Sequence, residues 1–122
     1  MRRFINKIID RIQRKRAIRN HRKMWHWLAE NPTKSKFDYF RSTNKFPFNA
    51  CHLCEYANSV SDRTGDIAFC QYCPLDWDGQ ECGKENSLFE RWALEGFSKC
   101  MDVQKRTELA LQIAELPEKV EK

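Results

Sequence analysis

The chain contains little that would interrupt helices, because only four glycines and four prolines occur among its 122 residues. Charged residues make up 32% of it, so the composition favours a largely helical protein over a disordered one. No apolar run approaches the ~20 residues that a helix needs to cross a bilayer. No apolar segment follows the basic N-terminus, as it would in a secretory signal. We therefore expect a soluble, cytoplasmic protein.

Motifs of common enzyme sites are also missing. The sequence has no Gly-rich phosphate loop, no HExxH helix and no G-x-S-x-G elbow. We expect a non-enzymatic protein.

Two closely spaced cysteine pairs form the most informative pattern in the chain. Cys51 and Cys54 make one C-x2-C pair, and Cys70 and Cys73 make a second after fifteen intervening residues. This spacing is typical of a four-thiolate zinc site, and cytoplasmic thiols are normally reduced. The sequence predicts a structural Zn²⁺ ion bound by these four residues, with Cys82 as an alternative ligand.

Four thiolates fill the tetrahedral shell of zinc and leave no position for water, which indicates a structural role. The resulting charge of −2 needs nearby cations or N–H groups, and His52 and Arg63 are the candidates in the sequence. Cys100 lies farther along the chain and is interpreted as a small buried apolar residue.

The segment between the cysteine pairs is predicted to form a β-hairpin. Glu55–Ala57 and Ile67–Phe69 have the composition of short strands, and the polar residues 58–66 would turn the chain between them. A hairpin of this kind would bring both pairs to one ion, as in a zinc ribbon.

The other elements are predicted to be helices. One long helix spans Arg2–Glu30 and ends before Asn31-Pro32, and a short helix follows the possible N-cap Ser35. Two C-terminal helices follow, one from Leu88 to about Phe97 and one from Asp102 to Leu116. The predicted fold is mainly α with a small zinc-ribbon-like β-hairpin. Its parts are a basic amphipathic N-terminal arm over residues 1–18, a helical zinc-binding domain over 19–117 and a tail over 118–122.

The first helix has two apolar faces that point in nearly opposite directions. At about 100° per residue, the isoleucines of its first half share one side, and the apolar residues of its second half share the other. The first set is Ile5, Ile8, Ile9 and Ile12, and the second is Ile18, Met24, Trp25 and Leu28. We infer either two segments with different partners or one helix that carries a second apolar face out of the domain.

Positive charge is concentrated in the same helix, where residues 1–30 contain ten Lys and Arg against two acidic residues. A protein partner is the leading hypothesis, and a nucleic acid is the alternative. An anionic membrane surface and a homodimer through the N-terminal helix remain open. The candidate contact residues are Ile5, Ile9, Arg11, Arg14, Lys15, Arg16, Arg19, Arg22 and Lys23.

Several segments resemble small four-cysteine zinc-site proteins encoded by phages and prophages of Gram-positive bacteria. The matching segments are CHLCEYA, CQYCPLDW, a further cysteine, a helix with Trp92, HRKMWHWLAE at residues 21–30 and ALQIAELPEK. The resemblance implies a phage-derived accessory protein, located in the cytoplasm of the bacterial host cell, that carries a thiolate zinc site. It implies nothing about a substrate. On this basis the expected function is that of a zinc-stabilised factor engaging a host protein or complex.

Overall fold

The computed structural model describes residues 2–47, 50–65, 69–77 and 81–119. Within these ranges the protein is mainly helical, which confirms the predicted class. The α-helices are α1 (Arg2–Glu30), α2 (Lys36–Thr43), α3 (His52–Thr64), α4 (Leu88–Phe97) and α5 (Val103–Ala114), and a short 3₁₀ helix, η2, spans Phe69–Tyr72.

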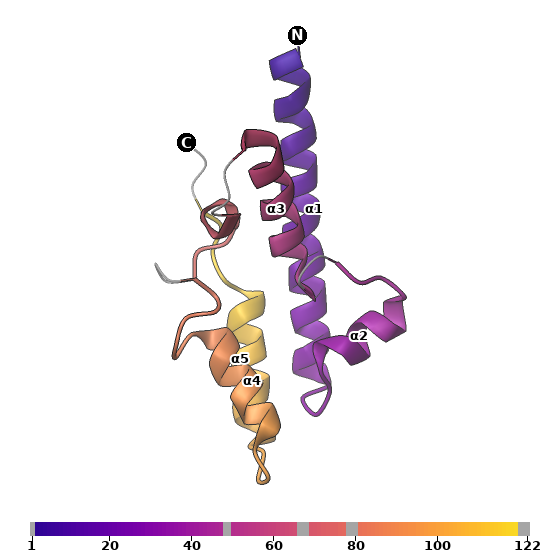
Figure 1. The fold of residues 1–122 in the computed structure, drawn as a ribbon. Helices are drawn as coiled ribbons and strands as arrows, with labels where there is room; N and C mark the ends of the chain where they lie inside the picture. The colour runs from indigo at the N-terminus through magenta and orange to yellow at the C-terminus, as the bar shows by residue number, and fades with distance from the viewer. Residues whose placement is uncertain (1, 48–49, 66–68, 78–80, 120–122) are drawn as a thin grey trace.

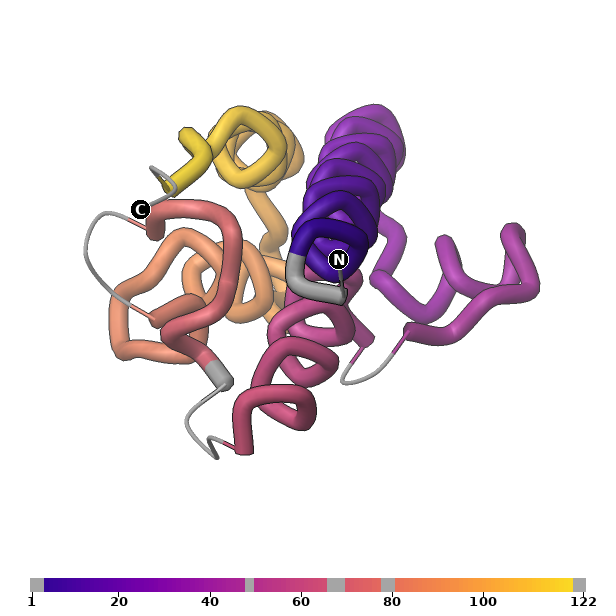
Figure 2. The backbone as a smooth tube through the Cα atoms, turned by 90° about the horizontal axis from the view of Figure 1, so that it is seen from above, coloured from indigo at the N-terminus to yellow at the C-terminus, as the bar shows by residue number. Residues whose placement is uncertain are grey.

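Helix α1 is the axis on which the other helices pack (Figure 1). Seen along this axis, α3 and α5 lie on different sides of it, and α4 packs on α5 (Figure 2). Both α3 and α5 run antiparallel to α1, since Asp10 pairs with Arg63 and His21 contacts Ile113. The N-terminal turns of α1 extend past the end of α3 (Figure 1).

The hydrophobic core lies along the second half of α1. Trp25 packs perpendicular to Trp92 of α4, with 4.7 Å between the ring centroids. Met24, Leu28 and Ile113 are fully buried around this pair. Edge-to-face aromatic contact adds to the area that these rings remove from water.

The predicted helical span Arg2–Glu30 is confirmed, and of the two interpretations left open the structure shows one continuous helix. Its second apolar set is buried, with Ile18 4% and Leu28 0% exposed, whereas the isoleucines of its first half are exposed. The two apolar sets lie on opposite sides of the helix, so only one of them can face the core.

The predicted helix starts are also confirmed. Ser35 caps α2 in a complete capping box with Asp38, Ser87 accepts a hydrogen bond from the Glu90 N–H, and Asp102 accepts one from the Lys105 N–H. Each cap satisfies a backbone N–H that has no partner inside the helix. Helix α5 ends at Ala114, two residues before the predicted end.

The predicted first strand of the zinc hairpin is wrong, because Glu55–Ala57 lies inside α3. Cys51 caps this helix, and Gly65 ends it in the left-handed conformation at φ 75°. Leu53, Tyr56 and Ala57 are buried at a helical spacing, so packing favours a helix there. Of the predicted second strand, Ile67 and Ala68 lie outside the described residues, and Phe69 begins η2.

The first residues of the predicted tail contact α1 and the segment around Leu75. Leu75 and Glu118 form an antiparallel bridge, and Arg14 of α1 binds the Glu118 carboxylate at 2.9 Å. Arg14 also donates to the carbonyls of Pro74 at 3.3 Å and Lys119 at 2.8 Å. Residues 118–119 are therefore part of the packed structure, while residues 120–122 lie outside the described part.

The predicted arm, residues 1–18, is joined to α3 through Asp10. Asp10 accepts hydrogen bonds from Tyr56 and Arg63 of α3, each at 2.9 Å. Ala17 and Ile18 are buried. None of the described helices combines the length and the apolar character that a membrane span requires.

Candidate metal centre

Five of the six cysteines come together from three separate segments. Cys51 and Cys54 stand at the N-terminus of α3, Cys70 lies in η2, Cys73 follows η2 directly, and Cys82 lies in the loop before α4. All of them are free thiols. They line a common cavity of about 30 Å³, together with Trp77 and Lys119 among others. A cavity of this size has room for about one water molecule or ion.

Electrostatic contacts single out four of the five thiols. A hydrogen bond with Cys54 and burial raise the pKa of Cys51. Burial raises the pKa of Cys73, whereas a hydrogen bond from Cys54 lowers that of Cys82. Each of these four thiols interacts with at least one of the others, while Cys70 is exposed. All five thiols line the cavity, and burial favours Cys82, the alternative ligand in the sequence, over Cys70 as the partner of Cys51, Cys54 and Cys73.

N–H groups surround these sulfurs. The Cys54 backbone N–H donates to Cys51 Sγ over 3.4 Å, in the first turn of α3. The backbone N–H of Leu75 and the indole of Trp77 act against burial by lowering the pKa of Cys73. The N-terminus of a helix and N–H···S contacts both favour the thiolate form, which is the form that binds metal.

The indole N–H of Trp77 is an independent sign that an anion belongs here. Trp77 is 9% exposed and lines the thiol cavity, yet its Nε1 atom is buried without an acceptor at hydrogen-bond geometry. The indole also lowers the pKa of Cys73, so this sulfur is the acceptor available to it. A buried donor without a partner is costly, and a thiolate at Cys73 would give it one.

The donor set fits a soft divalent ion such as Zn²⁺, which prefers four thiolates. Among the described residues, no three His, Cys, Asp or Glu side chains form a ready coordination group. The sulfurs of Cys51, Cys54 and Cys82 are instead joined by hydrogen bonds between thiols.

Lys36 is a cation beside the thiol cluster that the sequence did not indicate. Its side chain extends from the first residue of α2 and donates to the Ala50 carbonyl at 3.2 Å, next to Cys51. Burial lowers the pKa of Lys36, while the charges of Cys51, Cys82 and Cys54 raise it. The only local signal at this position is the N-cap Ser35, which fixes the start of the helix and gives no direction to the lysine.

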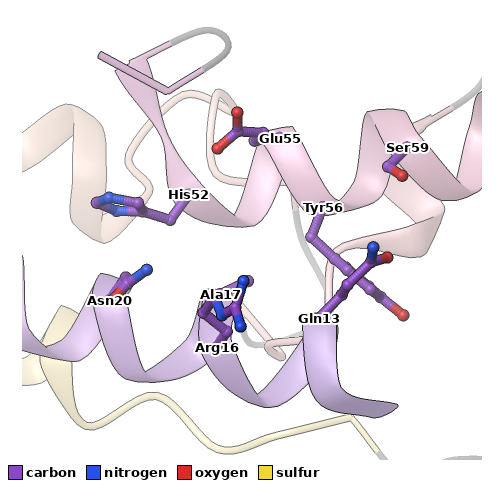
Figure 3. A pocket seen from close by; sticks show the side chains of 8 residues that line it. All are labelled: Gln13, Arg16, Ala17, Asn20, His52, Glu55, Tyr56 and Ser59. Carbon is purple, nitrogen blue, oxygen red and sulfur yellow. The ribbon is translucent and has the colours of Figure 1, made fainter. Parts of the chain in front are cut away.

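The two cations expected beside the metal lie elsewhere. Arg63 pairs with Asp10 of α1 at 2.9 Å, because it occupies the last turn of α3, far along the helix from Cys51. His52 lines the groove between α3 and α1 (Figure 3), and it is not among the residues that line the thiol cavity. Cys100 is exposed in the loop between α4 and α5, so its predicted burial is wrong.

The predicted contact residues of α1 separate into two groups. Ile5 is 49% exposed and Ile9 is 42% exposed, and no described element covers them. Arg11, Lys15, Arg16, Arg19 and Lys23 are exposed as well. Arg14 and Arg22 point inward, because they bind carbonyls of the C-terminal segment, Arg22 donating to Leu116 at 3.2 Å.

A shallow polar groove of about 240 Å³ runs between α1 and α3 (Figure 3). Arg16 and Asn20 line it from α1, and His52 and Tyr56 line it from α3, whereas the Glu55 carboxylate points away from α1. Its volume is below the usual range of small-molecule sites, about 300–1,000 Å³. The groove has room for a side chain of a partner beside the exposed face of α1.

Comparison of the chain with protein-family models, with characterised proteins and with solved structures finds no match.

Proposed function

We propose that the chain is a zinc-stabilised, non-enzymatic binding protein whose helix α1 docks on a protein partner. The observation that carries this proposal is the exposed apolar face of the first half of α1. Phe4 is 68% exposed and Ile12 is 53% exposed, and Ile5, Ile8 and Ile9 lie between them on the same side. Apolar residues at helical spacing on an uncovered face are typical of a helix that binds a groove in another protein.

The chemistry of the partner follows from the residues beyond Ile12. The same outward side of α1 continues with Lys15, Arg16, Arg19 and Lys23, all of them exposed. A matching surface would have an apolar groove next to a row of carboxylates. The resemblance described above supports a host protein in the bacterial cytoplasm, bound by a phage-derived accessory factor.

The partner is tested by co-purification from the native host with wild type and with the Ile5→Asp/Ile9→Asp double variant. Burying an isoleucine is worth about 1.5–3 kcal/mol, so the double variant should bind about 100-fold more weakly or worse. Leu94→Asp is a matched control, because Leu94 is 60% exposed on α4. A stoichiometric partner that is retained by Leu94→Asp and lost by the double variant supports the proposal.

A membrane surface or a second copy of the chain could also cover the exposed isoleucines, and the same wild type and variants distinguish these cases. Flotation with anionic vesicles that is lost in the double variant would indicate a membrane surface. A dimer of wild type that dissociates in the double variant, measured by sedimentation, would indicate self-association. A partner that binds all three proteins equally would contradict docking through the isoleucines.

Nucleic acid is a second candidate partner. It is favoured by five exposed cations in the middle part of α1: Arg11, Lys15, Arg16, Arg19 and Lys23. If all five contact phosphates, log Kd should change with log salt by a slope of about 4 to 5. Charge reversal at Arg16 and Arg19 should reduce that slope, whereas Ile5→Asp/Ile9→Asp should leave it unchanged. Absence of binding at low salt would reject this function.

A further inference from the structure

The ammonium group of Lys36, a partly buried residue, lies against aromatic rings of the core. Its Nζ atom lies 4.4 Å from the centroid of the Phe89 ring and 5.5 Å from that of Trp25. Its hydrogen-bond acceptor is the Ala50 carbonyl. Contact with aromatic faces and with one carbonyl offsets part of the lost hydration of an ammonium, but a buried charge normally also has an anionic partner.

No described carboxylate forms an ion pair with Lys36. The ionisable groups that act on it are the thiols of Cys51, Cys82 and Cys54. The carbonyl that Lys36 binds belongs to Ala50, which directly precedes Cys51 in the chain. The ammonium group therefore lies beside the thiol cluster without a described carboxylate to balance its charge.

A zinc ion bound by thiolates would supply the negative charge that Lys36 lacks. Four thiolates and one Zn²⁺ carry a net charge of −2, and such a centre inside a protein needs donors and cations around it. Trp77 and the first turn of α3 supply N–H groups, and Lys119 supplies a positive charge at the exposed rim, where water screens it. Lys36 supplies a charge on the core side, away from that screening.

We propose that Lys36 is the internal counter-cation of a tetrathiolate zinc centre formed by Cys51, Cys54, Cys73 and Cys82. The proposal rests on the zinc-stabilised function proposed above and adds the residue that balances the charge of the metal. It makes zinc and Lys36 mutually stabilising: the metal provides the anion that the lysine lacks, and the lysine favours the thiolates that the metal needs.

The test compares wild type with Lys36→Met, which has a side chain of similar length without the charge. The readout is the zinc dissociation constant of the full-length chain, measured by competition with a chromophoric chelator. Loss of groups that support metal ligands typically weakens metal binding 10- to 100-fold, and we expect an effect of that size. Lys45→Met is the matched control, because Lys45 is exposed on the link after α2, and it should bind zinc like wild type.

Two further readouts separate charge balance from packing. Without metal, Lys36→Met should be as stable as wild type or more so, because it removes a buried charge that has no partner. With Co²⁺ in place of zinc, the sulfur-to-metal charge-transfer band of Lys36→Met should move to lower energy, since the thiolates lose a stabilising cation. Lys36→Arg keeps the charge and should retain the wild-type band.

The outcomes distinguish this proposal from the zinc centre itself. Wild type that binds no zinc would overturn both. Wild type that binds zinc together with a Lys36→Met variant of unchanged affinity and unchanged Co²⁺ spectrum would overturn the role of Lys36 alone. If Lys36→Met does not fold without metal, the role is packing and the proposal also fails.

Discussion

Among single residues, His21 shows how a polar group is accommodated in the core. It is 1% exposed, and its Nε2–H donates to the Ile113 carbonyl at 3.2 Å, while its Nδ1 atom has no partner among the residues that the structure describes. Burial lowers the pKa of His21 from 6.5 to about 3. The ring is therefore neutral in the folded protein at neutral pH and joins α1 to α5 as a hydrogen-bond donor.

This histidine should make the stability depend on pH. Between pH 6.5 and about 3 the unfolded chain binds a proton at His21 that the folded chain does not bind. The contribution of the neutral ring is therefore complete above pH 6.5 and is lost as the pH falls. The loss should be about 1.4 kcal/mol per pH unit within that range. Urea unfolding of wild type and His21→Gln between pH 7 and 5 measures it, with a flatter profile expected for the variant.

His26→Gln is the control for this comparison, because His26 lies on α1 but is exposed. Acid also weakens metal binding at the thiolates, and this effect is common to all three proteins. Parallel stability profiles for wild type and His21→Gln would contradict the assigned role of the buried ring.

Among the elements, the α4–α5 pair depends on Arg106. Its guanidinium donates to the carbonyls of Trp92, Pro32 and Lys34, and its Cζ atom lies 4.1 Å from the centroid of the Trp92 ring. The side chain thereby connects α5 to α4 and to the loop before α2. Gly96 of α4 leaves the space that this guanidinium occupies.

Gly96→Ala should therefore destabilise the protein, although alanine favours helices by up to about 1 kcal/mol over glycine. A Cβ atom at this position would lie 2.5 Å from Arg106 Nη2 and 2.8 Å from Cζ. Moving the guanidinium weakens hydrogen bonds worth about 1.5–3 kcal/mol each, so we expect a net loss of about 1–3 kcal/mol. Chemical denaturation measures the loss.

Gly83→Ala is the matched control, because a Cβ atom there meets nothing within 4 Å. It should leave the stability nearly unchanged. In an Arg106→Ala background, Gly96→Ala should become neutral or stabilising, which a double-mutant cycle would detect. An equal loss with and without Arg106 would show that the glycine serves another purpose.

Considered as a whole, the molecule has an aromatic core at one end of α1 and the thiol cluster at the edge of that core. Cys51, Cys73 and Cys82 are themselves packed against core residues. Most residues of the core cluster lie on α1 and α5, so removing the metal should unfold the cysteine-bearing segments before the α1–α5 pair.

Chelation of zinc should lower the melting temperature and should reduce amide protection in α3 before α5. Structural zinc is worth about 10–16 kcal/mol apparent in small modules, comparable to the whole stability of a domain. Calorimetry and hydrogen exchange with and without chelator measure the two effects. An unchanged melting temperature would contradict a structural ion.

The ligand set is resolved by serine substitutions in the same assays. Cys82→Ser should release zinc, whereas Cys70→Ser should retain it, because Cys70 is exposed and outside the group of four interacting thiols. Cys100→Ser is the control for loss of a thiol elsewhere. Zinc lost from Cys70→Ser and kept by Cys82→Ser would restore the four ligands that the cysteine spacing predicts.

Local signals in the sequence predicted most of the helices. Caps at Ser35, Ser87 and Asp102 and the absence of breakers before Pro32 act between residues a few positions apart, so they can be found without a structure. Helix α3 was missed because Glu55–Ala57 is too short a segment to distinguish the period of a strand from that of a helix. The cysteine spacing likewise pointed to a thiol cluster, since close pairs are a local feature.

The sequence by itself therefore determined the helical class, the span of α1 and the segments that carry the clustered cysteines. Only the tertiary structure decided that Cys82 lines the same cavity as the two cysteine pairs, and that Lys36 reaches the Ala50 carbonyl next to Cys51. The physical reason is that these contacts join residues far apart in the chain. Their positions follow from how α2, α3 and the loop before α4 pack on α1, and no local pattern contains that information.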